Sequence, residues 1–123
     1  MFNQLKDENK MEQEISFISG STQYLVFEVL DKRGEPLDLT NSEIKWALSY
    51  MGQNSNPILI KDNKLKGGVS ISGIGEFTVV LNATDTTMLE SSKYEHEPII
   101  IQPSGKILRP AYGLISIKKG SSY

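Results

Sequence analysis

The segment Tyr94-Glu-His-Glu97 holds the one histidine of the 123-residue chain, placed between two carboxylates. Such a cluster could act as an acid–base pair or hold a metal ion. A strand places neighbouring side chains on opposite faces, however, so Glu95 and Glu97 should face away from His96 unless a bulge near Pro98 rearranges them. A nucleophilic mechanism would also need a base beside Ser, Cys or Thr and a group that orients that base. We therefore expect a packed structural histidine and no catalytic residue.

Three carboxylates near one turn, Asp31, Glu35 and Asp38, could offer hard oxygen ligands to Ca²⁺. Their spacing does not match an EF-hand loop, and they lack its number of ligands, so solvated turn residues are expected instead. The glycines of 73–75 are not followed by Lys-Ser/Thr and a helix, which a phosphate-binding loop requires. The sequence predicts no enzyme, no metal and no cofactor.

Sugar binding requires aromatic faces that are open to solvent. Trp46 is in phase with Ile44 and Leu48 on one face of a strand and is expected to be core. Tyr24 and Tyr112 are the best candidates for exposed aromatics. A pair of tyrosines could form a sugar platform, but exposed tyrosines are also common in protein–protein surfaces.

The composition fits one globular domain, with 38% hydrophobic and 23% charged residues. A net charge of −2 and a pI near 5.4 give no broad positive field. Nucleic acid and anionic membranes are therefore not expected as partners. The chain has no cysteine, which excludes disulfides and thiolate metal sites.

The first 14 residues are mostly polar and lack the apolar stretch of a signal peptide or a membrane span. We interpret residues 1–14 as an arm whose apolar members Phe2, Leu5 and Met11 cannot bury enough surface alone to order it. These three residues are the candidate contacts with a partner protein. The alternative is an arm that docks on its own domain.

Short alternating runs recur at spacings of roughly 8–12 residues, a pattern typical of a sandwich or barrel. They predict an all-β fold, an immunoglobulin-like antiparallel β-sandwich of about seven to nine short strands over residues 15–119, followed by a tail at 120–123. The expected strands lie within 15–17, 24–30, 44–50, 58–60, 69–71, 77–81, 94–101 and 107–117.

A helical turn near residues 84–90 interrupts the alternation, with Thr84 as its cap. Met88 and Leu89 are then expected to plug the open end of the core. Tyr94, placed after this turn, is either a tyrosine corner, whose hydroxyl bonds back to upstream backbone, or an ordinary core tyrosine. Pro98 and Pro110 cannot donate to a β-ladder, so each should mark an edge or a bulge.

Several of these segments together resemble the N-terminal domain of phage baseplate upper proteins and its single-domain relatives in phage tails and heads. The most distinctive motif is Gly-x-Pro-x-Asp-Leu-Thr after an alternating strand, and the likeness spans roughly residues 15–117. The matching runs are Leu25-Val-Phe-Glu-Val-Leu-Asp31, Gly34-Glu-Pro-Leu-Asp-Leu-Thr40, Ile44-Lys-Trp-Ala-Leu48, Gly75-Glu-Phe-Thr-Val-Val-Leu81 and Tyr94-Glu-His96.

This resemblance implies an immunoglobulin-like sandwich without catalytic residues, a virion protein assembled in the host cytoplasm. It would dock to other phage structural proteins in the tail, baseplate, neck or head surface, as a homo-oligomer or ring. Two departures are notable: Ser91-Ser-Lys93 replaces the family's usual glycine before the tyrosine, and no helical stalk follows before Tyr123. An accessory virion subunit is therefore expected, and a carbohydrate-binding or host-attachment module is the alternative.

Overall fold

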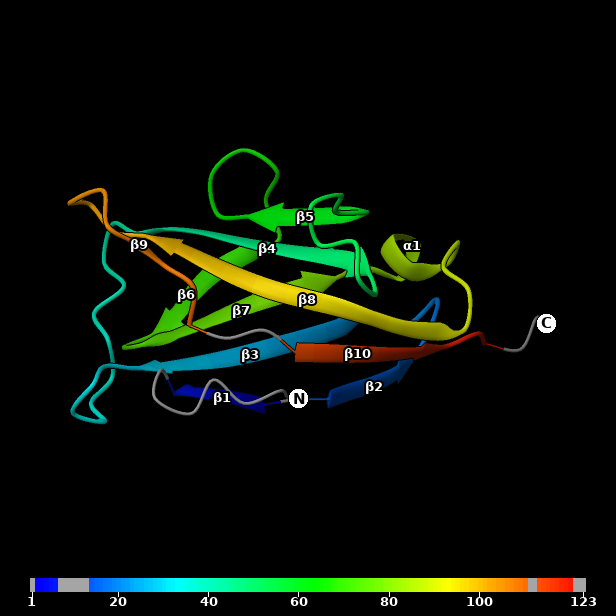
Figure 1. Cartoon of the computed structure of the whole chain (residues 1–123), viewed down its shortest axis with the longest axis horizontal. Helices are drawn as coiled ribbons and strands as arrows, with labels where there is room; N and C mark the ends of the chain where they lie inside the picture. Colours follow the sequence, from blue (N-terminus) through cyan, green and yellow to red (C-terminus); the bar gives the residue numbers. More distant parts are fainter. Residues whose placement is uncertain (1, 7–13, 111–112, 121–123) are drawn as a thin grey trace.

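The computed structural model describes residues 2–6, 14–110 and 113–120, and side chains from residue 15 onward (Figure 1). Ten strands and one short helix lie in these ranges. In chain order they are β1 (Phe2–Lys6), β2 (Glu14–Ile18), β3 (Gln23–Leu30), β4 (Glu43–Tyr50), β5 (Leu59–Asp62), β6 (Val69–Gly73), β7 (Glu76–Leu81), α1 (Ala83–Thr86), β8 (Ser92–Ile101), β9 (Ile107–Leu108) and β10 (Gly113–Lys118).

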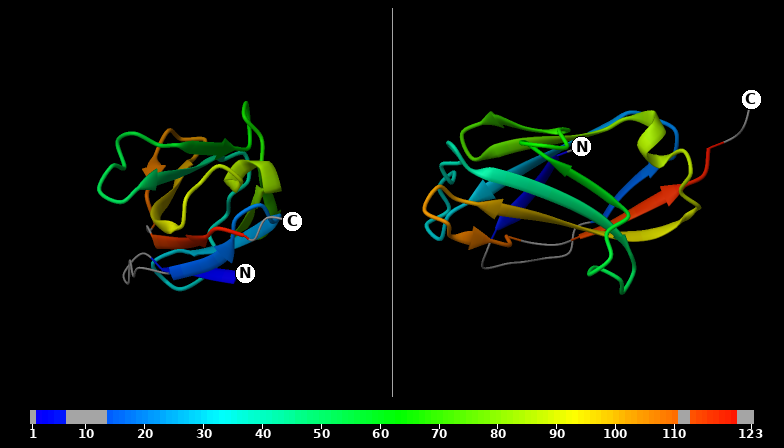
Figure 2. Two further views of the ribbon diagram at one scale, coloured as in Figure 1. Left: turned by 90° about the vertical axis from the view of Figure 1, so that its right-hand side faces the viewer. Right: turned by 90° about the horizontal axis from the view of Figure 1, so that it is seen from above.

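The described strands form two sheets, which surround a common interior in the views of Figure 2. One sheet has the order β1-β3-β7-β6, and the other has the order β2-β10-β8-β4-β5, with β9 also paired to β8. The first order matches the A-B-E-D sheet of an immunoglobulin sandwich, and β10-β8-β4 match its G-F-C sheet, which β5 extends on one side and β2 on the other. The predicted all-β sandwich is confirmed.

Two pairings differ from the expected purely antiparallel arrangement. β1 runs parallel to β3, with Phe2 opposite Val26 and Leu5 opposite Val29. β2 runs parallel to β10, with Ile15 opposite Ile115. The chain therefore supplies an edge strand to each sheet in turn, and the sandwich begins before the predicted boundary at residue 15. Residues 2–6 lie on the edge of their own domain because β3 offers unpaired backbone groups there.

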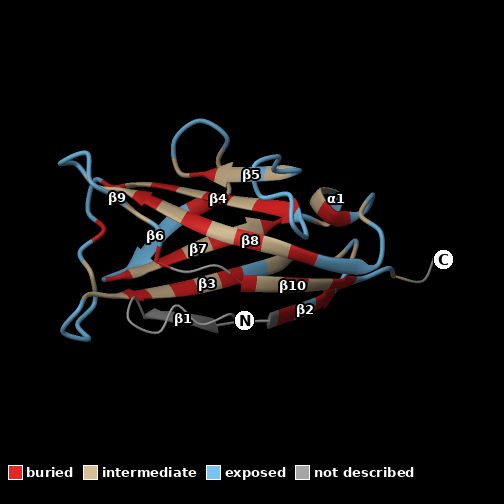
Figure 3. Ribbon diagram, in the orientation of Figure 1, coloured by how far each residue is buried: buried red, intermediate tan, exposed pale blue. Residues whose placement is uncertain are grey.

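The core lies between the sheets and follows the period-2 alternation of the strands. Figure 3 shows buried residues alternating with partly buried ones along β3, β7, β8 and β10. Trp46 and Tyr94 are fully buried, as predicted. The largest fully buried side chains are Trp46, Tyr94, Phe27, Phe77, Ile15, Leu25, Leu39, Ile44, Leu48, Leu81, Ile100 and Ile115.

The helical turn α1 is shorter and capped differently from the prediction. It begins after Asn82, whose backbone N–H donates to the Asp85 carboxylate at 2.7 Å, so Thr84 is not the cap. Met88 is 85% exposed and does not plug the core. The buried hydroxyl of Thr86 instead accepts a hydrogen bond from Gly20 N at 3.0 Å, while Leu89 packs partly against the core. A one-turn helix rotates each side chain by a large angle, so small phase errors exchange inside and outside.

The tyrosine corner is present. The Tyr94 hydroxyl donates a 2.8 Å hydrogen bond to the backbone carbonyl of Glu90, four residues upstream. This bond forms with Ser91-Ser-Lys93 directly before the tyrosine. The corner ties the start of β8 to the segment that crosses between the sheets.

Pro98 lies within β8, an interior strand, at a point where only one side of the strand is paired. Strand β10 pairs with β8 as far as His96, and β9 pairs with it from Ile100 onward. Pro98 falls between these two ladders, where a missing N–H removes no bond to β9 or β10. On its other side it lies opposite Trp46 of β4.

Candidate functional site

His96 is a core residue whose ring bonds to the core tryptophan. The side chain is 3% exposed, and its Nδ1 accepts a hydrogen bond from the Trp46 indole Nε1–H at 3.0 Å. The ring also packs against Phe27, with centroids 5.7 Å apart. Burial lowers the pKa of His96 to about 4, so the ring is neutral at physiological pH. The neutral ring with an accepting Nδ1 carries its proton on Nε2.

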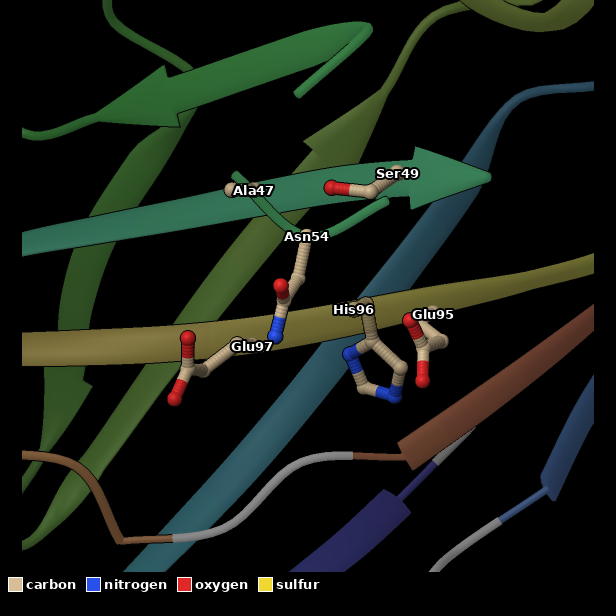
Figure 4. Close-up of a pocket in the computed structure, with 6 residues that line it drawn as sticks. All are labelled: Ala47, Ser49, Asn54, Glu95, His96 and Glu97. Atoms are coloured by element: carbon tan, nitrogen blue, oxygen red, sulfur yellow. The ribbon is translucent and has the colours of Figure 1, made fainter. Parts of the chain in front are cut away.

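The flanking carboxylates lie on the outer face of the sheet, as the alternation predicted. A hollow of about 190 Å³ is present there, between the strands and the loop after β4, and Figure 4 shows the residues that line it. Glu95 accepts a hydrogen bond from the backbone N–H of Gly52 at 3.0 Å, and Glu97 pairs with Arg109 at 3.1 Å. These carboxylates therefore hold a loop and a strand connection in place. The hollow does not bring them together with an available imidazole nitrogen, because Nδ1 is occupied and Nε2 is buried.

Two of the three turn carboxylates accept hydrogen bonds from backbone N–H groups of their own turns. Asp31 Oδ1 accepts from Arg33 N at 2.8 Å and from Glu35 N at 3.0 Å, and Asp38 Oδ1 accepts from Thr40 N at 2.9 Å. These hydrogen bonds lower the pKa of both aspartates, chiefly through the Glu35 N–H at Asp31 and the Thr40 hydroxyl at Asp38. Within the described ranges, no group of three or more His, Cys, Asp or Glu side chains could hold a metal ion.

The remaining predicted site residues are only partly covered by the structure. Tyr24 lies on β3 and is 59% exposed, as expected. Tyr112 and Met11 lie outside the described residues, so the two-tyrosine platform stays a prediction. Phe2 and Leu5 lie in β1, where only their backbone pairing with β3 is described. Their role as partner contacts also stays a prediction.

The larger depression lies at the end of the sandwich where the turn after β3 meets the turn between β8 and β9. Both turns are at the left-hand end of Figure 1. The depression, which we call the turn groove, has a volume of about 470 Å³. Its apolar wall is formed by Val29, Leu30, Leu37, Leu108 and Pro110, and the charged side chains on its rim are Asp31, Lys32, Arg33, Lys106 and Arg109.

Sequence reasoning did not find the turn groove. Lys32 and Lys106 are more than 70 positions apart in the chain and meet only because both turns leave the same end of the sandwich. Assigning the predicted strands to the positions of an immunoglobulin sandwich would have placed the two turns together, because the B–C and F–G connections lie at the same end of that fold.

The described residues thus form an immunoglobulin-like sandwich in which the core imidazole accepts a hydrogen bond from the indole. Among solved structures, the chain is similar to the N-terminal domain of ORF48 of phage TP901-1, with a TM-score of 0.62 and 12% sequence identity. The match covers 97% of this chain and 100% of that chain. At this identity the likeness shows a common fold. No family model and no curated protein matches the sequence. Across the described residues, no helix has the length and apolar character needed to cross a membrane.

Proposed function

We propose that this protein is a non-enzymatic structural or accessory component of a bacteriophage virion that docks to other virion proteins. The observation that carries the proposal is its likeness in fold to a phage protein domain over nearly the whole length of both chains. The internal arrangement supports it. The imidazole that could have done chemistry is buried against Trp46. Asp31 and Glu95 bind backbone N–H groups, and Glu97 pairs with Arg109.

The same proposal places the protein in the assembled particle, in the tail, baseplate, neck or head surface. A sandwich that seals its large side chains inside offers its outer faces, its strand edges and its end turns for contact. Repeated copies in a homo-oligomer or ring would follow from the symmetry of the particle.

The direct test is to purify particles from a lysate of the strain that carries the gene and to detect the protein in them by mass spectrometry. We expect it to co-purify with particles through a density gradient and to cross-link to other structural proteins. Its absence from particles that are otherwise complete would overturn the proposal.

A second experiment tests the predicted arm contacts. A phage lacking the gene is complemented with Phe2→Ser, Leu5→Ser and Met11→Ser combined, and copies per particle are compared with the unsubstituted chain. The matched control carries Asn3→Ser and Gln4→Ser in the same segment. We expect lower incorporation for the first variant only. Equal incorporation of both would count against an arm that contacts a partner.

The alternative, a carbohydrate-binding or host-attachment module, rests on the exposed ring of Tyr24. It predicts saturable binding of the isolated protein to purified cell-wall polysaccharide, with loss of binding in Tyr24→Ala or Tyr112→Ala. The structural proposal predicts no such binding. A pull-down with insoluble cell-wall polysaccharide distinguishes the two.

A further inference from the structure

The turn groove occupies the end of the sandwich that immunoglobulin variable domains use for recognition. Its two sides come from the connection between β3 and β4 and from the connection between β8 and β9. In the immunoglobulin order the first is the B–C connection and the second is the first part of the F–G connection from β8 to β10, and in antibodies these two connections carry binding loops. This correspondence is one of architecture, whereas what the groove can bind depends on its chemistry.

The wall of the groove is apolar and rests on the core. Leu37 and Leu108 are partly buried and pack against the core cluster, while Val29 is 2% exposed. Leu30 and Pro110 complete this surface. The volume of about 470 Å³ falls in the range of sites that enclose a small ligand or a few side chains. An occupant with one or two apolar side chains would therefore gain contact that a fully polar chain would not.

The rim of the groove is positively charged, although the protein as a whole is negatively charged. The chain as a whole has a net charge of −2, whereas four basic side chains and one carboxylate line the groove. The carboxylate, Asp31, already accepts hydrogen bonds from two backbone N–H groups. Arg33 remains 84% exposed despite lying 3.6 Å from Asp31, and Arg109 remains 59% exposed beside Glu97. Exposed cations above an apolar wall favour an anionic occupant that also carries apolar groups.

We propose that the turn groove binds a short acidic peptide segment of a partner protein, whose apolar side chain lies on the Leu37 and Leu108 wall and whose carboxylates meet the rim cations. This inference deepens the proposed function and rests on it in taking the partner to be a protein. A polyol phosphate polymer of the cell wall would satisfy the cations but would leave the apolar wall without a complement. The peptide therefore fits both features of the groove.

The test uses the purified full chain and a fluorescein-labelled hexapeptide of two leucines flanked on each side by two glutamates, with binding followed by fluorescence anisotropy. We expect saturable binding that weakens at least about tenfold in Lys32→Glu combined with Lys106→Glu. It should also weaken when salt is raised from about 0.05 M to about 0.5 M, because screening acts on exposed charges. The salt series needs no variant, so it tests the inference even if the substitutions disturb the fold.

The matched control is Lys66→Glu combined with Lys118→Glu, two exposed lysines outside the groove that give the same change in net charge. This control should bind the peptide as the unsubstituted chain does. Replacing the two leucines of the peptide by serines should also weaken binding at least about tenfold, since the apolar wall then has no partner. The inference would be overturned if the peptide did not bind, or if the serine peptide bound as tightly as the leucine peptide. It would also be overturned if the control variant lost as much affinity as the groove variant, or if purified teichoic acid bound more tightly than the peptide. If the peptide does not bind but the protein is found in particles, the proposed function stands and only the groove inference fails. If the peptide binds but the protein is absent from particles, only the proposed function is overturned.

Discussion

The indole Nε1–H of Trp46 donates a hydrogen bond to Nδ1 of His96 across 3.0 Å, at the centre of the sandwich. His96 lies two residues after the corner residue Tyr94, the position that in antibody domains holds the second cysteine of the inter-sheet disulfide. Phe27 of β3 packs against His96 from the other sheet, and Trp46 comes from β4, the strand that carries the core tryptophan in those domains. In this cysteine-free chain, the ring contact between Phe27 and His96 joins the sheets where antibodies use a covalent bond, and the hydrogen bond from Trp46 holds the imidazole within its own sheet.

This contact should be measurable as a coupling free energy. Trp46→Phe removes the N–H donor and leaves the buried Nδ1 of His96 without its partner, so we expect the free energy of unfolding to fall by about 1–3 kcal/mol from this effect alone. A double-mutant cycle with His96→Leu, followed by urea unfolding, should give a coupling energy of about 0.5–3 kcal/mol. Additive effects of the two substitutions would contradict a direct interaction.

Stability should depend on pH through His96. Its pKa is about 4 in the folded protein and 6.5 as the reference value, so the unfolded chain takes up a proton first as the pH falls. Stability is therefore full above about pH 6.5, declines toward pH 4, and the histidine contribution is lost below that point. We expect a loss of about 2 kcal/mol between about pH 7 and about pH 5, measured by urea unfolding at each pH.

The control for the pH dependence is His96→Gln, which keeps a hydrogen-bond acceptor but does not titrate. Its stability should be nearly constant over the same interval, because the chain has no other histidine. Asp31 and Asp38 have lowered pKa values, so their stabilising contribution is lost only at more acidic pH, as it falls through their folded values. An equal slope in the variant and the unsubstituted chain would show that His96 is not the titrating group.

The hydrogen bond of the tyrosine corner should make a small contribution to the free energy of unfolding, which can be measured apart from the packing of the ring. Tyr94→Phe removes the 2.8 Å hydrogen bond to the Glu90 carbonyl and should lower the free energy of unfolding by about 1 kcal/mol. Tyr50→Phe is the matched control, since Tyr50 packs against Tyr94 but is 50% exposed, and its effect should stay within about 0.5 kcal/mol. Similar losses for both variants, measured by chemical unfolding, would argue against a specific corner.

Substitutions at two turn glycines, Gly34 and Gly75, distinguish the effect of backbone strain on stability from the effect of a steric clash. Gly34 and Gly75 have φ of +82° and +68°, so Ala is strained at both positions, by about 1–2 kcal/mol. At Gly34 a Cβ atom meets nothing within 4 Å, whereas at Gly75 it would lie 2.8 Å from Pro36 Cβ and 3.0 Å from Leu37 N. We expect Gly75→Ala to lower the thermal midpoint clearly more than Gly34→Ala. Equal shifts would mean that the turn before β7 does not pack closely on the turn after β3.

Much of the strand pattern could be predicted from local sequence. Alternation in 24–30 and 44–50 placed Leu25, Phe27 and Trp46 in the core correctly, because a strand side chain can face only one of two ways. The same reasoning failed at Met88, where one helical turn decides the direction and no long period corrects an error.

The sequence by itself determined the all-β class and the buried tryptophan and tyrosine, since each depends on residues close together in the chain. The tertiary structure decided that β1 and β2 join different sheets, each as a strand parallel to its neighbour. It also decided that His96 contacts Trp46 and that Lys32 and Lys106 border one groove. These features depend on pairings between segments far apart in the chain, and many such pairings satisfy the same local alternation. Only packing the two sheets together selects one of them.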